Sequence, residues 1–152
     1  MLTNILDPDF TSCAGIDVLV CVPFGPKADQ VIQILKSLKC RPYLAVSPED
    51  ALRKLRFNAF QVILITSGYS SEVSKDLMEK PMSSRRHFFY IYVDSEAETG
   101  NPFQAFALSA NLVLNMNELD ILKERLEPAL MDYNKLYRVY YNVSKTQEEQ
   151  SH

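Results

Sequence analysis

A run of four aliphatic residues, 62–65, stands out in the hydrophobic pattern of the chain, and Thr66, Ser67 and Gly68 follow it directly. Such an uninterrupted apolar run, bounded by turn formers, is typical of a strand that is buried on both faces of a parallel sheet. In sheets of this kind, ligands usually bind at the carboxyl ends of the strands. Thr66 and the residues expected beside it are therefore the first candidates for a functional site.

Shorter apolar runs alternate with segments of helical periodicity along the rest of the chain. Helix-start signals open several of these segments, among them Pro26, Ser47 and Asn101. In the segment after Asn101, Phe103 and Ala110 are among the residues expected to face inward. The predicted strands are residues 17–22, 43–46, 62–65, 88–93 and 112–114, and the predicted helices that follow them are 26–38, 48–55, 70–80, 102–110 and 117–126.

These five strand-and-helix units predict an α/β fold with one doubly wound sheet. Each crossover between parallel strands requires a helix and is right-handed, so helices are expected on both faces of an open five-stranded parallel sheet. The 152 residues, of which 47% are hydrophobic and 23% charged, suit one globular domain with a sizeable core. Residues 1–16 have no periodicity and are predicted to form a loosely held arm in front of this domain.

Charge and composition exclude several classes of function. The net charge of -3 and the isoelectric point near 5.4 give no general attraction to nucleic acids or anionic membranes. No apolar run is long enough to span a bilayer, and the N-terminus lacks the basic segment and apolar core of a signal peptide. We therefore predict a cytoplasmic protein without membrane insertion or nucleic-acid binding. The one basic cluster, residues 85–87 with Lys80, is interpreted as a solvated loop, or alternatively as a contact for an acidic partner.

The chain has few residues of the types that serve in catalysis, metal binding or phosphate binding. Cys13, Cys21 and Cys40 are far apart and include no C-x-x-C pair, so free buried thiols are expected, and neither a disulfide framework nor a zinc site is indicated. His87 is expected at the amino edge of the sheet, which leaves no base beside Thr66 for nucleophilic catalysis. The four glycines form no phosphate-binding loop. No cofactor and no metal are predicted.

Residues 45–55, with the sequence AVSPEDALRKL, and the strand FQVILIT that follows them carry a resemblance to a known family. In the order and spacing of its elements, the segment 17–130 resembles the receiver domain of bacterial response regulators. This resemblance implies a flavodoxin-like sheet with the strand order 2-1-3-4-5. It also implies a role in signal transduction by a two-component system.

Receivers accept a phosphoryl group on an aspartate at the end of the third strand. An acidic pair after the first strand holds magnesium, a hydroxyl residue ends the fourth strand, and a lysine ends the fifth. The matching positions of this sequence hold Val22 and Pro23, Thr66, Asp94 and Asn115. The resemblance therefore implies a pseudo-receiver with a degenerate phosphoacceptor pocket, which is not an enzyme and acts as a protein–protein interaction module.

A second hypothesis assigns another task to the same edge of the sheet. Thr66, Ser67, Asp94 and Asn115 are expected to converge there, and a hydroxyl beside a carboxylate is able to bind a small polar ligand. The chain would then be a small-ligand sensor or an enzyme. The competing interpretation is that these side chains cap turns and helix ends.

The chain continues beyond the usual length of a receiver. Pro128 is predicted either to kink the last helix or to start a new one, and the polar residues 144–152 are predicted to be a disordered tail. Between them, residues 131–143 form a predicted helical extension with tyrosines at helical spacing, and tyrosine is favoured at interfaces. We predict a homodimer or a docked protein partner at this face; in the alternative, the tyrosines fold back over residues 1–16. The predicted interaction surface consists of Leu130, Tyr133, Leu136, Tyr137, Tyr140 and Tyr141.

Overall fold

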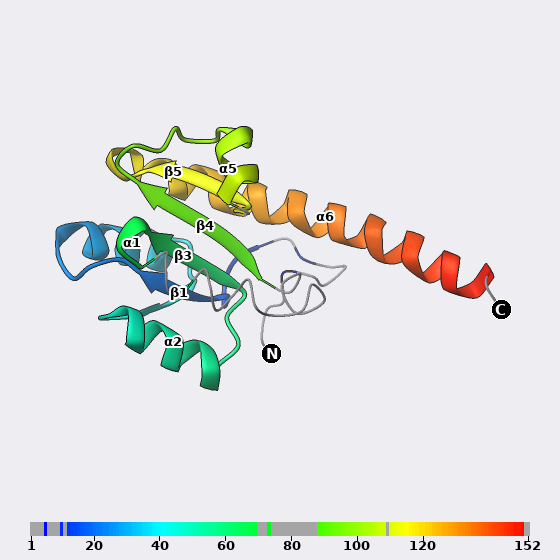
Figure 1. The fold of residues 1–152 in the computed structure, drawn as a ribbon, viewed down its shortest axis with the longest axis horizontal. Coiled ribbons are helices and arrows are strands. Elements are labelled where there is room, and N and C mark those ends of the chain that lie inside the picture. The colour runs from blue at the N-terminus through cyan, green and yellow to red at the C-terminus, as the bar shows by residue number, and fades with distance from the viewer. Residues whose placement is uncertain are drawn as a thin grey trace.

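The computed structural model describes residues 5, 10, 12–69, 73, 88–108 and 110–150, and for residues 106, 107 and 137–150 it describes the backbone alone. The strands are β1 (Asp17–Cys21), β2 (Arg41–Leu44), β3 (Val62–Thr66), β4 (Phe89–Asp94) and β5 (Leu112–Asn115). They pair in parallel in the order β2-β1-β3-β4-β5 (Figure 1). The predicted fold class and strand order are therefore confirmed.

Helices cover both faces of the sheet. Val31 of the first helix and Leu126 of the last pack in one core cluster, whereas Ala51 of the second packs in the other. The helix predicted at 70–80 lies outside the described residues, except for the buried Val73. The described helices are α1 (Pro26–Ser37), α2 (Pro48–Phe57), α5 (Pro102–Leu108), the 3-10 turn η1 (Met116–Glu118) and α6 (Ile121–Gln150).

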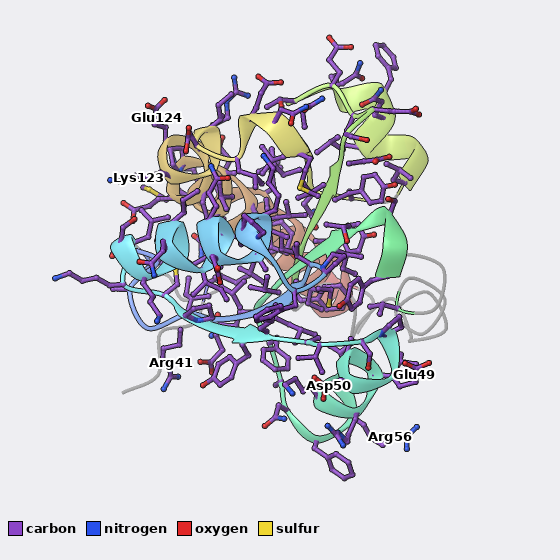
Figure 2. The ribbon with its side chains drawn as sticks, turned by 90° about the vertical axis from the view of Figure 1, so that its left-hand side faces the viewer. Arg41, Glu49, Asp50, Arg56, Lys123 and Glu124 are labelled. Carbon is purple, nitrogen blue, oxygen red and sulfur yellow. The ribbon has the colours of Figure 1, made fainter. Side chains whose placement is uncertain are left out.

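Strand β3 lies at the centre of the sheet and supplies side chains to both clusters. Val62 and Leu64 pack on the side of α1 and α6, whereas Ile63 and Ile65 pack on the side of α2. Successive side chains of a strand point to opposite faces, so a strand covered on both sides requires apolar residues at consecutive positions. Charged side chains such as Arg56, Lys123 and Glu124 point away from the sheet (Figure 2).

The first turn of helix α5 differs from the prediction at Phe103. The Oδ1 atom of Asn101 accepts hydrogen bonds from the backbone N–H groups of Phe103, at 2.9 Å, and Gln104, at 3.1 Å. This cap fixes the first turn of the helix. In that turn Phe103 is 83% exposed, so the prediction that it faces inward is wrong. Ala110 does pack against the core, as predicted.

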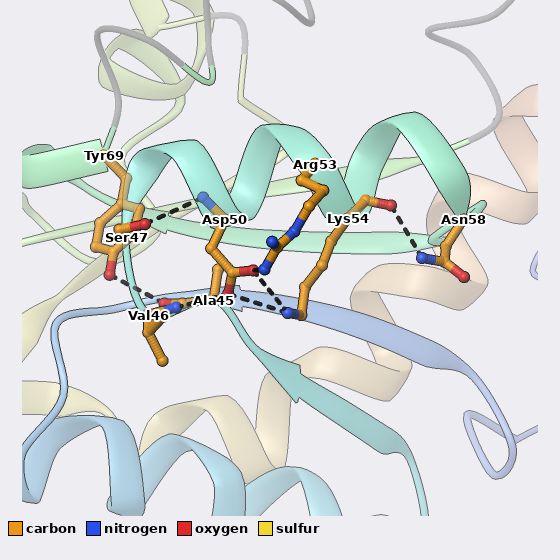
Figure 3. A network of polar contacts seen from close by, with 8 residues as sticks. All are labelled: Ala45, Val46, Ser47, Asp50, Arg53, Lys54, Asn58 and Tyr69. Atoms are coloured by element: carbon orange, nitrogen blue, oxygen red, sulfur yellow. Dashed lines mark hydrogen bonds and ion pairs between the residues drawn. The ribbon is translucent and has the colours of Figure 1, made fainter.

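The start of α2 is held by a reciprocal cap (Figure 3). The hydroxyl of Ser47 accepts from the Asp50 N–H at 3.1 Å, and the Asp50 carboxylate accepts from the Val46 N–H at 3.0 Å. Arg53 and Lys54 contact the same carboxylate at 2.6 and 3.0 Å. These bonds lower the pKa of Asp50 from its ordinary value of 3.8 to about 2, chiefly through the Val46 N–H and the Lys54 ammonium.

Acidification is therefore expected to weaken the fold through Asp50. Because its pKa is lower in the folded chain, the ionised carboxylate stabilises the protein fully above its unfolded pKa of 3.8, and this contribution disappears as the pH falls toward about 2. The loss is on the order of 1 kcal/mol, given the partly exposed cations. Urea denaturation at pH 5 and at pH 2 should show a smaller pH effect in Asp50→Asn than in the unmodified protein. Equal pH effects in the two proteins would contradict this assignment.

The N-terminal arm is not loosely held at the positions that the structure describes. Ile5, Phe10, Cys13 and Ile16 are all buried in the cluster that contains α1 and α6. The Ile5 N–H donates to Gln61 Oε1 at 2.6 Å, and the Ile5 carbonyl accepts from Asn134 Nδ2, also at 2.6 Å. The arm is thus attached to the start of β3 and to α6, and the prediction of a loose arm is wrong at these residues.

Helix α6 is one element of 30 residues. Pro128 lies inside it and does not start a new helix. The backbone remains helical to Gln150, so the disordered tail predicted from 144 is not found over 144–150. Figure 1 shows the second half of α6 projecting well beyond the sheet. This long helix therefore has an anchored half and a projecting half.

Candidate functional site

Thr66 ends β3 at the carboxyl edge of the sheet, as predicted. Its side chain is only 3% exposed, and its hydroxyl donates a hydrogen bond to the Cys21 carbonyl of β1 at 3.1 Å. Its backbone pairs in register with Val93 of β4. The hydroxyl is thus bound to the neighbouring strand, in agreement with a structural role.

The two residues after β1 provide no ligands for a cation. Val22 is buried in the cluster of α1 and α6, whereas Pro23 is exposed. Magnesium binds oxygen ligands, and neither side chain has an oxygen atom. Among the residues that the structure describes, no three His, Cys, Asp or Glu side chains gather in a way that would hold a metal ion.

Asn115 of β5 holds the loop that follows β4. Its Nδ2 atom donates to the Ser95 carbonyl at 3.1 Å and to the Ala97 carbonyl at 2.7 Å, and its Oδ1 atom accepts from the Asn117 N–H at 2.8 Å. Its own N–H donates to the Thr99 hydroxyl at 2.9 Å. The Asn115 amide is therefore occupied in fixing the backbone of the β4–α5 loop.

Asp94 lies opposite Asn115 in the register of β4 and β5. Its carboxylate accepts from the Ser95 N–H at 2.7 Å and from the Tyr92 hydroxyl at 3.4 Å. Burial, followed by the negative charge of Asp94, raises the pKa of Tyr92. Thr66, Asp94 and Asn115 thus lie on adjacent strands at one edge, but their hydrogen bonds run to neighbouring backbone and to the hydroxyls of Tyr92, Ser95 and Thr99. The arrangement favours capping over ligand binding.

The predicted interaction surface is divided by the structure. Leu130 is completely buried and belongs to the core, so it is not available on a surface. Tyr133 is half-buried, and its ring packs edge-on against Phe89 with centroids 5.6 Å apart. Leu136 is 71% exposed. The side chains of Tyr137, Tyr140 and Tyr141 lie outside the described residues, as do His87 and the basic cluster of 85–87 with Lys80.

Sequence reasoning missed the polar anchors of the arm. Glu127 of α6 accepts from the Cys13 N–H at 3.2 Å and lies 3.4 Å from the Cys13 sulfur. The buried Asn134 binds the Ile5 carbonyl. The available signal was the position of these two polar residues next to the apolar face of α6, each about one turn from Leu130. A polar residue so placed is expected to find a partner when the helix packs.

Comparisons with solved structures support the fold. The receiver domain of Francisella response regulator 1452 is 17% identical, with a TM-score of 0.61, over 76% of this chain and 96% of that one. The N-terminal domain of a response regulator/sensory box/GGDEF protein from Carboxydothermus hydrogenoformans is 14% identical, with a TM-score of 0.57, over 82% and 98%. A fusion that carries the trimeric coiled coil of yeast Spc42 is 12% identical, with a TM-score of 0.63, over 92% and 93%.

These likenesses show that the chain has the fold of receiver domains. No family model matches the sequence, and none of the curated proteins matches it. No described helix is both long enough and apolar enough to cross a membrane.

Proposed function

We propose that this chain is a pseudo-receiver, a receiver-like domain that takes no phosphoryl group and acts as a cytoplasmic protein-interaction module in bacterial signal transduction. The observation that supports the proposal is that Thr66 ends β3, where receivers hold the acceptor aspartate, and that its hydroxyl donates to the Cys21 carbonyl. Transfer to an acceptor also requires a cation and compensating positive charge. Val22, Pro23 and Asn115 offer neither.

The absence of phosphoryl chemistry has a direct test. Beryllofluoride with magnesium, or acetyl phosphate with magnesium, is expected to leave the amide NMR spectrum of the protein unchanged, because there is no acceptor carboxylate at Thr66. Magnesium alone serves as the control for weak surface binding. A saturable shift centred on Thr66 would refute the proposal.

The module is proposed to associate through α6 with a second copy of the chain. Leu136 is 71% exposed, and the second half of α6 projects past the sheet (Figure 1). In the sequence, Tyr133, Leu136, Tyr140 and Val143 follow one another at spacings of 3, 4 and 3, which is the pattern of coiled-coil seams. One similar structure, the Spc42 fusion, carries a coiled coil, and its likeness extends over 92% of this chain.

Self-association depends on Leu136 in this proposal. Light scattering over a concentration series is expected to show a homodimer, and Leu136→Ala should raise its dissociation constant by about tenfold, because an exposed apolar contact at the seam is lost. Leu108 of α5, which is 40% exposed, gives the matched control, and Leu108→Ala should leave the dimer unchanged. A monomer at every concentration, or equal effects of both substitutions, would contradict dimerisation through α6.

A further inference from the structure

Two cysteines that are distant in the sequence lie against each other in the fold. The backbone of the arm runs beside the start of β2: the Gly15 N–H donates to the Lys39 carbonyl, and the Arg41 N–H donates to the Ile16 carbonyl, both at 2.8 Å. Between these two bonds, the Cys40 thiol donates to the Cys13 carbonyl at 3.3 Å. The fold therefore places the Cys40 thiol in contact with the backbone of Cys13.

The environments of the two thiols differ. Cys13 is fully buried, with its sulfur 3.6 Å from the Leu38 carbonyl and 3.4 Å from Glu127 Oε2, whereas Cys40 is 5% exposed. A hydrogen bond between the two side chains, together with burial and the Glu127 carboxylate, raises the pKa of Cys13. The same hydrogen bond lowers the pKa of Cys40. Cys40 is thus the less completely buried residue of the pair, and its pKa is shifted down where that of Cys13 is shifted up.

We propose that Cys13 and Cys40 are a thiol–disulfide exchange site, which a low-molecular-weight disulfide of the glutathione type converts reversibly into an intramolecular disulfide. The site is independent of the proposed interaction through α6. It requires two sulfurs that the fold brings together, and disulfides form only between cysteines whose backbones lie close to each other. The hydrogen bonds on either side of Cys40 hold it beside Gly15 and Ile16 of the arm, and the 3.3 Å contact of its thiol with the Cys13 carbonyl brings the two cysteines together.

The reaction takes place in two exchange steps. The Cys40 thiolate attacks one sulfur of the small disulfide, which forms a mixed disulfide and releases one small thiolate. The Cys13 sulfur, after losing its proton, then attacks the Cys40 sulfur, which forms the Cys13–Cys40 bond and releases the second small thiolate. The two protons from the cysteines are taken up by the two released thiolates. The cysteine pair is oxidised by two electrons, and the small disulfide is reduced by the same two.

Oxidation would change the attachment of the arm. A disulfide replaces the Cys40 hydrogen bond to the Cys13 carbonyl with a covalent link between the arm and the start of β2. It also removes the thiol proton that Cys13 presents to Glu127 of α6, so that the backbone N–H of Cys13 alone remains bonded to that carboxylate. Oxidation of the pair would therefore change the hydrogen bonding of Glu127 on α6.

Cys21 provides an internal control. It is buried in the cluster on the α2 face of the sheet, whereas Cys13 and Cys40 belong to the cluster on the other face. Burial raises its pKa to about 12, and neither of the other two cysteines lies in its cluster, so it has no neighbouring sulfur with which to form a disulfide. Cys21 is expected to stay reduced under conditions that oxidise the pair.

The experiment incubates the full, reduced, folded chain in buffers with an increasing ratio of oxidised to reduced glutathione. Each sample is quenched in acid, labelled with a maleimide in denaturant and analysed by mass spectrometry. The number of labelled cysteines is expected to fall from three to one, with a linked peptide that joins Cys13 to Cys40 and the label on Cys21. Adding dithiothreitol should restore all three labels.

Three labelled cysteines in the most oxidising buffer, a link that includes Cys21, or a glutathione adduct on Cys40 that never resolves would overturn the proposal. Cys21→Ser is the matched variant, and it should still form the Cys13–Cys40 link. Cys13→Ser should leave Cys40 as a mixed disulfide with glutathione, and circular dichroism checks that this variant is folded. If it does not fold, the peptide map of the unmodified protein and of Cys21→Ser still decides the question.

Discussion

Leu130→Ala is expected to lower the free energy of unfolding by about 3 kcal/mol, because it removes a completely buried side chain from the cluster shared by α1, α6 and the arm. The cost combines the lost transfer of apolar surface from water with the cavity that remains. Urea denaturation followed by circular dichroism measures it, at a protein concentration low enough for any dimer to dissociate.

Leu136→Ala is the matched control on the same helix. Leu136 is 71% exposed, so its truncation should change the free energy of unfolding by about 0.5 kcal/mol or less. If the two leucines gave equal losses, α6 would not have the division into an anchored and a projecting half on which the proposed interaction surface rests.

Ile5→Ala is expected to destabilise the protein by about 2 to 4 kcal/mol, although Ile5 lies in a stretch whose sequence has no periodicity. The side chain is fully buried, and its backbone is bonded on one side to Gln61 and on the other to Asn134. Loss of the side chain weakens the packing that keeps both backbone bonds formed. The same denaturation experiment measures the effect.

Ile5→Val is a milder substitution, and it tests whether the loss of stability follows the amount of side chain removed at this site. Ile5→Val removes one methylene group and should cost about 1 kcal/mol. Stability that is unchanged in both variants would mean that the arm contributes nothing to the fold, and that Ile5 is not packed against α6 in solution.

The central sheet could be predicted because its signal is local. Residues 62–65 are apolar at consecutive positions and are followed by turn formers, which is typical of a short strand covered on both faces. The turn and cap residues between strands also act over a few positions, as Ser47 does at the start of α2. The sequence predicts the ends of the strands less accurately than their presence. Strand β2 begins at Arg41, two residues before the predicted start, because Pro42 is tolerated in an edge strand.

Contacts between distant segments could not be predicted from local patterns. The arm looked featureless because its buried residues, among them Ile5, Phe10 and Cys13, have no regular spacing, and their partners lie on α6. Phe103 was misplaced because apolar spacing alone does not fix the phase of a helix with seven residues, whereas the Asn101 cap does. The helical state of 144–150 was missed because polar composition alone suggested disorder.

At the candidate site, the positions of Thr66, Asp94 and Asn115 were predicted at one edge of the sheet, since parallel strands end on the same side. Their hydrogen-bond partners were not, because these depend on the path of the following loop. The Asn115 amide reaches the carbonyls of Ser95 and Ala97, and only the folded loop places those carbonyls within reach.

The 30-residue α6 behaves mechanically as a lever. At 1.5 Å per residue it is about 45 Å long, and the part beyond Asn134 accounts for about 24 Å of that length. A rotation of about 5° of the half that is seated on the sheet therefore displaces the free end by about 2 Å. Side-chain adjustments at Leu126, Leu130 or Glu127 that barely alter the domain are thus amplified at the tip of the helix, where they become large enough to change how two surfaces fit together.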